Sequence, residues 1–143
     1  MLIKQLSVFI ENKPGRLAAV VEALGKNDID ISALSLADTS DYGILRLIVN
    51  RPEDAANVIR ELGVIVKITD VLTVSMDDTP GGLSKILEIF VKNDVHIDYM
   101  YAFVGTVTSK ALMVVKVNDP EAAVSALSKE GISTADAKDI YRL

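Results

Sequence analysis

The segment Asn12-Lys13-Pro14-Gly15-Arg16-Leu17 has a counterpart, Asp78-Thr79-Pro80-Gly81-Gly82-Leu83, sixty-six residues further along the chain. A second pair has the same offset: residues 27–31 read Asn-Asp-Ile-Asp-Ile, and residues 93–97 read Asn-Asp-Val-His-Ile. An internal repeat at this spacing is typical of one structural unit built twice. The sequence therefore predicts two copies of a single fold.

Hydrophobic periodicity predicts the same element order in both copies. Residues 2–10 alternate between two faces, which is typical of a strand with one buried face. The helix after each Pro-Gly turn has apolar residues at i, i+3, i+4 and i+7, namely Leu17, Val20, Val21 and Leu24 and then Leu83, Ile86, Leu87 and Phe90. Further strands are predicted over residues 29–38, 44–49, 95–104, 110–117 and 137–142, and helices begin at Pro52 and Pro120. Gly63 is a plausible end of the helix that starts at Pro52.

The order β-α-β-β-α-β, found twice, predicts an α+β fold of two ferredoxin-like βαββαβ units packed together. Each unit would have an antiparallel sheet with helices on one face. We place the units at residues 1–68 and 69–143. Residues 64–76 fit two interpretations: the last strand of the first unit is short and early, or one long strand serves both sheets.

Composition limits the possible functions. Half of the 143 residues are hydrophobic and 24% are charged, which is typical of a globular protein. The net charge of −5 argues against a nucleic-acid or membrane-surface partner, because such partners select basic patches. Cysteine is absent and His96 is the single histidine, which argues against Cys-His nucleophilic catalysis and against a metal site with several histidine ligands. We expect a cytoplasmic protein that is not an enzyme and carries no cofactor or metal.

Each Pro-Gly turn leads into a helix, and this arrangement favours ligand binding. Glycine lets a ligand approach the backbone closely, and the free N–H groups of a helix start attract a carboxylate. The same residues also fit a purely structural role as a tight turn. The two interpretations stay open at the level of the residues alone.

Residues 11–17, followed by residues 27–31, resemble the ACT domain, a small amino-acid-sensing module attached to enzymes of amino-acid metabolism. The resemblance covers essentially the whole chain as two ACT units without a catalytic domain. It implies that an amino acid binds at the interface of paired ACT units. The turn between first strand and first helix would hold the charged groups of the ligand, and a polar residue at the start of the second strand would add a contact.

This resemblance assigns a ligand-binding set by position: Asn12, Lys13, Pro14, Gly15, Asp30, Asp78, Thr79, Pro80, Gly81 and His96. Asn12 offers both a donor and an acceptor, and Asp30 would suit an α-ammonium group. In the second copy Asp78 replaces the neutral amide and would repel a carboxylate, which His96 could offset by donating or by pairing with Asp78. One site, or two sites of different specificity, would satisfy the sequence. Asp30 and His96 also fit exposed polar positions without function.

The sheet face opposite the helices carries apolar residues, namely Ile44, Ile48, Leu112 and Val114. Such a face needs a cover, and we expect the sheet of another chain to supply it in a homodimer. The main hypothesis is a regulatory protein that binds a free amino acid and modulates a separately encoded metabolic enzyme. The alternative is a ligand-free ACT-fold scaffold or enzyme subunit that acts through protein contacts.

Overall fold

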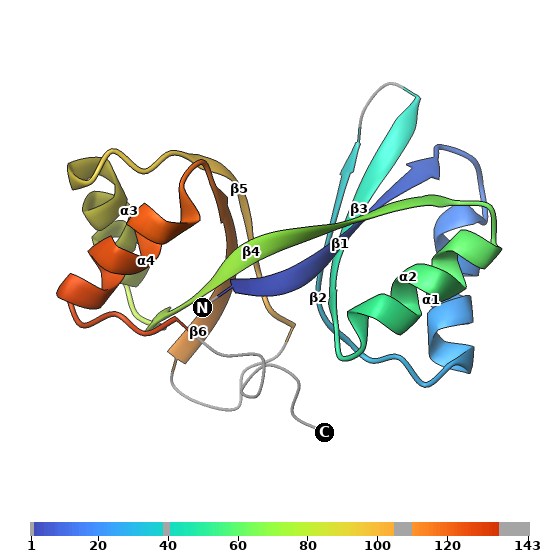
Figure 1. The fold of residues 1–143 in the computed structure, drawn as a ribbon, viewed down its shortest axis with the longest axis horizontal. Helices are drawn as coiled ribbons and strands as arrows, with labels where there is room; N and C mark the ends of the chain where they lie inside the picture. The colour runs from blue at the N-terminus through green and yellow to red at the C-terminus, as the bar shows by residue number, and fades with distance from the viewer. Residues whose placement is uncertain (1, 39–40, 105–109, 135–143) are drawn as a thin grey trace. The chain divides into compact units, whose positions relative to one another are not determined.

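A computed structural model describes residues 2–38, 41–104 and 110–134 (Figure 1). The chain divides into two units, which are considered separately below. The N-terminal unit contains residues 4–69, and the C-terminal unit contains the described residues of 1–3 and 70–143. The α+β prediction is confirmed, because the described residues form six strands and four helices in a ferredoxin-like pair.

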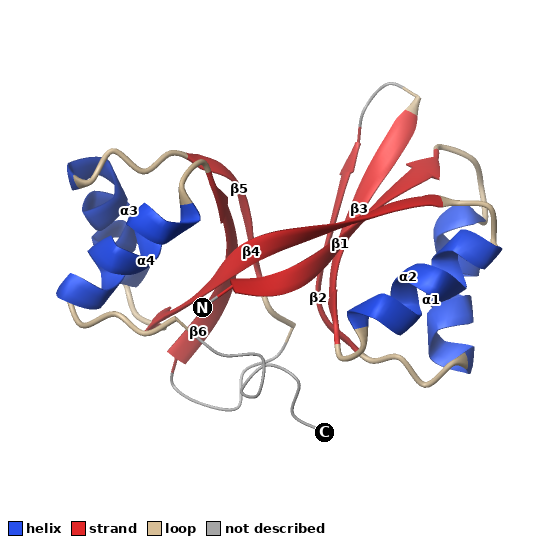
Figure 2. Ribbon diagram, in the orientation of Figure 1, coloured by secondary structure: helices blue, strands red, loops and turns tan. Residues whose placement is uncertain are grey.

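The N-terminal unit has the predicted order of elements: β1 (Leu2–Glu11), α1 (Arg16–Lys26), β2 (Ile31–Asp38), β3 (Tyr42–Val49), α2 (Pro52–Glu61) and the first part of β4 (Ile65–Asp77). Its strands are arranged as β2-β3-β1-β4, and β3 pairs antiparallel with both β1 and β2. Both helices lie on the same side of the strands (Figure 2). This is the strand order of a ferredoxin-like unit.

The C-terminal unit repeats the pattern with the second part of β4, α3 (Gly82–Lys92), β5 (Ile97–Ala102), β6 (Lys110–Val117) and α4 (Pro120–Lys129). Its strands are arranged as β4-β6-β5, with antiparallel pairs. On the other side of β4, Val74 forms an isolated bridge with Thr134. The strand predicted over residues 137–142 lies outside the described residues.

The segment between the copies forms one continuous strand, β4, of thirteen residues. Of the two interpretations of residues 64–76, the single long strand is therefore the one found. The predicted boundary between residues 68 and 69 falls inside this strand and stays a prediction.

Local sequence explains where the helices begin. Gly15 and Gly81 precede α1 and α3 at φ angles of 84° and 88°, a left-handed conformation that glycine adopts without steric cost. Pro52 and Pro120 open α2 and α4, as predicted, because the first N–H groups of a helix have no intrahelical partner.

Each unit has its own hydrophobic core between its helices and its strands. The core of the N-terminal unit contains Leu6, Val8, Ile10, Val20, Leu24, Leu45, Leu47, Val49, Ala55, Ala56, Ile59 and Val66. The core of the C-terminal unit contains Leu72, Val74, Met76, Ile86, Ile89, Phe90, Val95, Val115, Val117, Ala123, Ala126 and Leu127. The predicted stripes are only partly confirmed. Val20 and Leu24 of α1 and Ile86 and Phe90 of α3 lie in these cores, whereas Leu17, Val21 and Leu83 are exposed.

Burial on the second sheet face differs from the prediction. Ile48 and Val114 are fully buried within the single chain, although neither belongs to a helix-facing core, and only Ile44 and Leu112 are half-buried. The expectation that all four await another chain is therefore wrong. Similarly, β1 was expected to bury one face, yet Gln5 on its other face is also fully buried.

Candidate functional site

The turn between β1 and α1 presents four of the predicted site residues at the surface. Asn12, Lys13, Pro14 and Gly15 are all exposed. The backbone N–H of Asn12 donates to the carbonyl oxygen of Asp41 at 3.2 Å, which fixes the turn while leaving the Asn12 side chain at the surface. A Cβ atom added to Gly15 would meet nothing within 4 Å, so a ligand can reach the backbone there.

The turn between β4 and α3 has the same backbone form. Asp78, Thr79, Pro80 and Gly81 are exposed, and the carbonyl of Thr79 accepts a hydrogen bond from Gly82 N–H at 3.0 Å. Gly81, like Gly15, has open space where a Cβ would stand. The structure thus brings each predicted group of four residues together on one accessible turn.

The helices that follow these turns differ from the other two helices at their N-termini. Neither α1 nor α3 has a side-chain cap or an acidic residue in its first turn. By contrast, α2 and α4 carry acidic residues there (Glu53 and Asp54, and Glu121), and Asp119 caps α4 by accepting from Ala122 N–H at 3.1 Å. The positive ends of α1 and α3 therefore have no acidic residue in their own first turn to offset the helix dipole.

Ion pairs border both turns. Lys13 Nζ lies 3.0 Å from Glu11 Oε2, and this hydrogen bond, with the nearby charges of Lys13 and Arg16, lowers the pKa of Glu11. In the C-terminal unit Lys110 contacts Asp77 and lowers the pKa of that carboxyl, mainly through their hydrogen bond. Both carboxyl groups therefore stay ionised to lower pH than usual.

Asp30 and His96 lie at the other end of their sheets. Within the N-terminal unit Asn12 is hydrogen-bonded beside the start of β3, whereas Asp30 is hydrogen-bonded to Asn50 just after its end. The eight residues of β3 lie between them, which is about 26 Å at the usual rise per residue. Asp78 and His96 are separated in the same way along β6. No amino acid can touch both predicted residues within one unit.

The side chains of Asp30 and His96 are exposed. Their backbones are held by Asn50 and Asn118, which begin a further repeated segment: residues 50–53 read Asn-Arg-Pro-Glu, and residues 118–121 read Asn-Asp-Pro-Glu. Asn50 Oδ1 accepts from Asp30 N–H at 3.0 Å, and Asn118 Oδ1 accepts from His96 N–H at 2.9 Å. His96 Nε2 lies 3.4 Å from Asp94 Oδ1, and the two form an ion pair when the imidazole is protonated. Sequence reasoning missed the two asparagines, although their recurrence at the same place in both copies was a usable signal.

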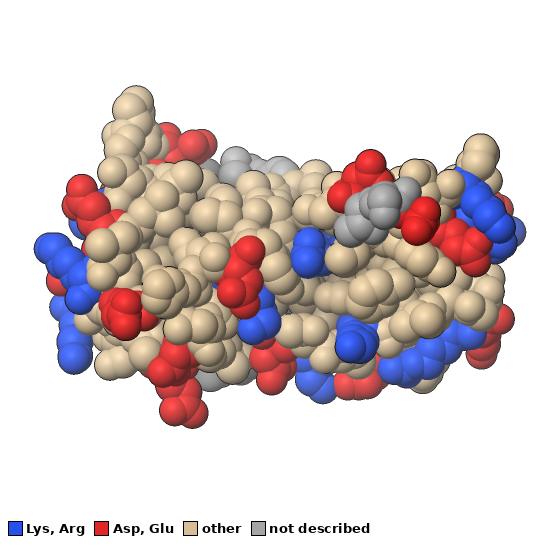
Figure 3. Space-filling view, turned by 90° about the horizontal axis from the view of Figure 1, so that it is seen from above, with Lys and Arg blue, Asp and Glu red and all other residues tan. Residues whose placement is uncertain are grey.

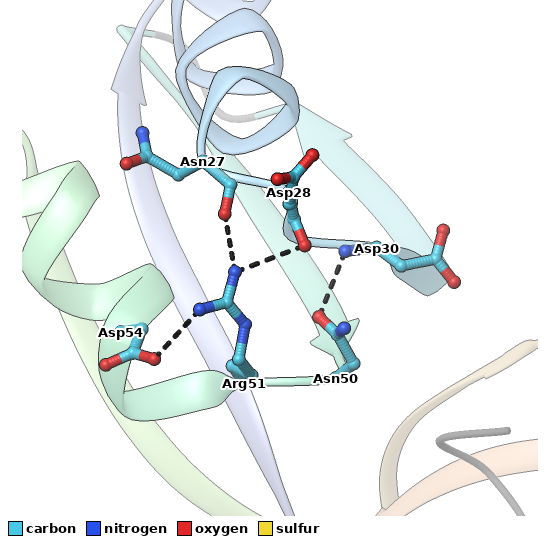
Figure 4. Close-up of polar contacts among 6 residues, drawn as sticks. All are labelled: Asn27, Asp28, Asp30, Asn50, Arg51 and Asp54. Atoms are coloured by element: carbon cyan, nitrogen blue, oxygen red, sulfur yellow. Dashed lines mark hydrogen bonds and ion pairs between the residues drawn. The ribbon is translucent and has the colours of Figure 1, made fainter. Parts of the chain in front are cut away.

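In the N-terminal unit the side chain of Arg51 makes contacts that the residue at its repeat position does not make (Figure 4). Arg51 donates from Nη2 to the carbonyl oxygens of Asn27 and Asp28, the latter at 3.2 Å, and from Nη1 to Asp54 Oδ2 at 3.3 Å. A guanidinium at the C-terminal end of α1 also complements the helix dipole. Asp119 occupies the same repeat position in the second copy and caps α4 instead.

Charges are interspersed on the face seen in Figure 3, with no continuous basic patch there. Among the described residues no group of three or more acidic or histidine side chains is placed to hold a metal ion. No helix within the described ranges has the length and apolar character needed to cross a membrane.

The sequence profile of the ACT domain pair matches residues 1–143. The chain therefore belongs to the ACT domain pair family. No curated protein matches it significantly.

Solved structures agree with this assignment. Protein BT0572 from Bacteroides thetaiotaomicron is 38% identical, with a TM-score of 0.93 over 100% of this chain and 98% of that one. The ligand-free regulatory subunit of aspartate kinase from Thermus thermophilus has a TM-score of 0.65 at 17% identity, covering 88% of this chain and 91% of its own. The corresponding subunit from Thermus flavus has a TM-score of 0.62 at 17% identity, covering 90% and 94%. The chain shares the fold of these regulatory subunits.

Proposed function

We propose that the protein is a regulatory module that binds a free amino acid and modulates a separately encoded enzyme of amino-acid metabolism. The observation that carries this proposal is the unneutralised N-terminus of α1, preceded by an open turn at Gly15. The carboxylate of the ligand would accept hydrogen bonds from the first N–H groups of the helix. Asn12 would contribute an amide beside it.

The comparison among the four helices supports this proposal. Helices that start with a proline have their own acidic residues or cap, and only the two helices after Pro-Gly turns lack them. An external carboxylate supplies the missing negative charge. In the C-terminal unit Asp78 weakens such a site by repulsion, and we therefore expect the turn at Asn12 to bind more tightly.

The binding test is a thermal-shift screen against the twenty amino acids. A ligand that binds only the folded state at one hundred times its Kd adds about 2.7 kcal/mol of stability by mass action. The Asn12→Ala variant should lose the shift. Asn57→Ala, an exposed asparagine on α2, is the matched control and should keep it. A shift retained by Asn12→Ala would contradict the proposed site.

Asp30 and His96 enter this proposal through a second copy of the chain. Because neither reaches the turn of its own unit, we propose that they contact a ligand held at the turn of a second copy in a homodimer. The N-terminal unit offers a surface for one: Leu34 and Leu36 on edge strand β2 are 44% and 54% exposed. An exposed apolar edge strand favours pairing with another chain.

Light scattering on the purified protein tests the dimer. Leu36→Glu should shift the mass from two chains toward one. Ala102→Glu, at the same repeat position on β5, should leave the mass unchanged. A monomeric wild-type protein would remove Asp30 and His96 from the proposed site.

A ligand changes regulation only through its different affinity for two states. If no amino acid shifts the melting temperature, the protein would instead be an ACT-fold scaffold that acts through protein contacts. The exposed apolar residues of β2 are the observation that favours this second function.

A further inference from the structure

A polar pocket lies in the C-terminal unit beside its turn. It is formed by the end of β4, the start of α3, the start of β6 and residues 130–133 after α4. Four charged side chains line it: Asp77, Lys85, Lys110 and Glu130. The pocket is open to solvent, and its charges come from four separate elements.

Two of these charges are paired with each other and two are not. Lys110 and Asp77 form an ion pair. Lys85 and Glu130 make no ion pair with any residue in the described part of the chain. The charge of Lys85 also helps to lower the pKa of Asp77, so it lies within range of that pair. The pocket offers a ligand one positive and one negative group that are not in an ion pair, Lys85 and Glu130.

Both groups stand at helix ends where their charge is unfavourable for the helix. Lys85 lies near the N-terminus of α3, which is the positive end of its dipole, and Glu130 is the C-cap of α4, at the negative end. Each charge strengthens the field of its own helix end. Such placement costs helix stability and suits the capture of opposite charges from solution.

The first copy shows that the fold does not need this polar lining. Ala19 stands at the repeat position of Lys85, Tyr42 at that of Lys110, and Leu62 at that of Glu130. The lining residues Ser75 and Ser133 likewise correspond to Phe9 and Ile65. The polar character is thus specific to the C-terminal unit.

Gly82 lines the pocket at the start of α3. Arg16 occupies its repeat position in the first copy. A Cβ at Gly82 would lie 2.1 Å from the carbonyl oxygen of Asp77, so only glycine allows this close approach of helix and strand.

We propose that this pocket binds a small zwitterionic amino acid, with its carboxylate at Lys85 and the start of α3 and its ammonium at Glu130 and the end of α4. The inference rests on the proposed function for the class of ligand, and the site itself is separate from the turn at Asn12. It places the ligand of the C-terminal unit beside Asp77 and Gly82, in a pocket that Asp78 does not line.

Amide chemical shifts of the full chain, followed during titration, test the site. The probes are L-serine and glycine, with acetate and methylammonium as the two half-ligands. L-serine or glycine should move the amide signals of Gly82, Lys85 and Gly131. Lys85→Ala and Glu130→Gln should each weaken binding about tenfold, which is the usual scale for one charge-assisted contact. Both half-ligands should bind at least about tenfold more weakly than the zwitterions, for the same reason.

Lys92→Ala and Glu121→Gln are the matched controls, because they remove one charge from the far ends of the same two helices. Both should bind the probes as the wild type does. Acetate binding as tightly as L-serine would overturn the inference, because a simple anion site would explain it. So would unchanged affinity in both Lys85→Ala and Glu130→Gln.

The same titration separates this site from the proposed function. Movement of the Gly15 amide without movement at Gly82 and Lys85 overturns the pocket and leaves the turn site standing. Movement at Gly82 and Lys85 that Lys85→Ala suppresses, with Gly15 unaffected, supports the pocket and overturns the turn site.

Discussion

At matching positions beside their turns, the N-terminal unit has Ala19, Tyr42 and Leu62 where the C-terminal unit has Lys85, Lys110 and Glu130. Tyr42 and Leu62 are 50% and 44% exposed. At these three positions the same backbone therefore carries uncharged residues in one copy and charged residues in the other.

The difference teaches which residues the fold requires. Both copies keep the glycine in the left-handed conformation, the asparagine that holds the second strand, and the proline that opens the second helix. The surface around these signals is free to diverge, because it contributes little to the cores. Divergence there is consequently more informative about function than the conserved turn itself.

The largest expected effect is at Gly82. Gly82→Ala places a Cβ 2.1 Å from a backbone oxygen, and we expect a loss of about 2 kcal/mol in the free energy of unfolding, the usual scale for overpacking. Arg16→Ala at the repeat position should cost less than about 0.5 kcal/mol, as for most exposed sites. Urea denaturation measures both. Equal losses would show that the two helix starts do not differ as described.

A smaller effect is expected where Arg51 and Asp119 differ. Asp119→Ala removes a helix cap and should cost about 1 kcal/mol. Arg51→Ala removes the contacts with the Asn27 and Asp28 carbonyls and should cost a similar amount, about 1 kcal/mol. Arg51→Asp also loses those contacts but gains a cap on α2, and should be less destabilising than Arg51→Ala. A larger loss of unfolding free energy in Arg51→Asp than in Arg51→Ala, measured by urea denaturation, would contradict this prediction.

The smallest effect concerns the pKa of Asp77. Lys110 lowers this pKa below its ordinary value of 3.8, so the pair stabilises the fold above that pH and loses its effect as pH falls through the folded-state pKa. Lys110→Met should raise the Asp77 pKa, as followed by NMR titration of its carboxyl carbon. Tyr42→Phe is the control, because the pKa of Glu11 is lowered by Lys13 and Arg16 and should not change. An unaltered Asp77 pKa in Lys110→Met would remove the ion pair as its cause.

The repeat and the hydrophobic periods were sufficient to predict the elements and their order. Helix starts at Pro52 and Pro120 and the bounds of β6 follow the prediction closely, because proline position and strand alternation are local properties. Burial of Gln5, Ile48 and Val114 depends on what covers a strand, which no local pattern contains.

The candidate site was predictable in part. The turn residues were found because Pro-Gly has a local meaning, and the resemblance supplied their role. The distance between Asn12 and Asp30 was also deducible, since α1 runs back along the sheet between them. The pocket at Lys85 and Glu130 was not predicted, because the repeat pattern identifies only residues that the two copies share. The useful signal is the set of repeat positions that hold a polar residue in one copy and an apolar residue in the other.

Strand β4 contributes to two cores with residues of one parity: Val66 to the first, and Leu72, Val74 and Met76 to the second. Because side chains alternate along a strand, inserting or deleting one residue between Val66 and Leu72 would turn one of these sets away from its core. A change of two residues would preserve both. Insertions and deletions between Val66 and Leu72 should therefore change the length of the strand by an even number of residues. Neither core imposes this constraint alone, because it arises only when one strand serves both.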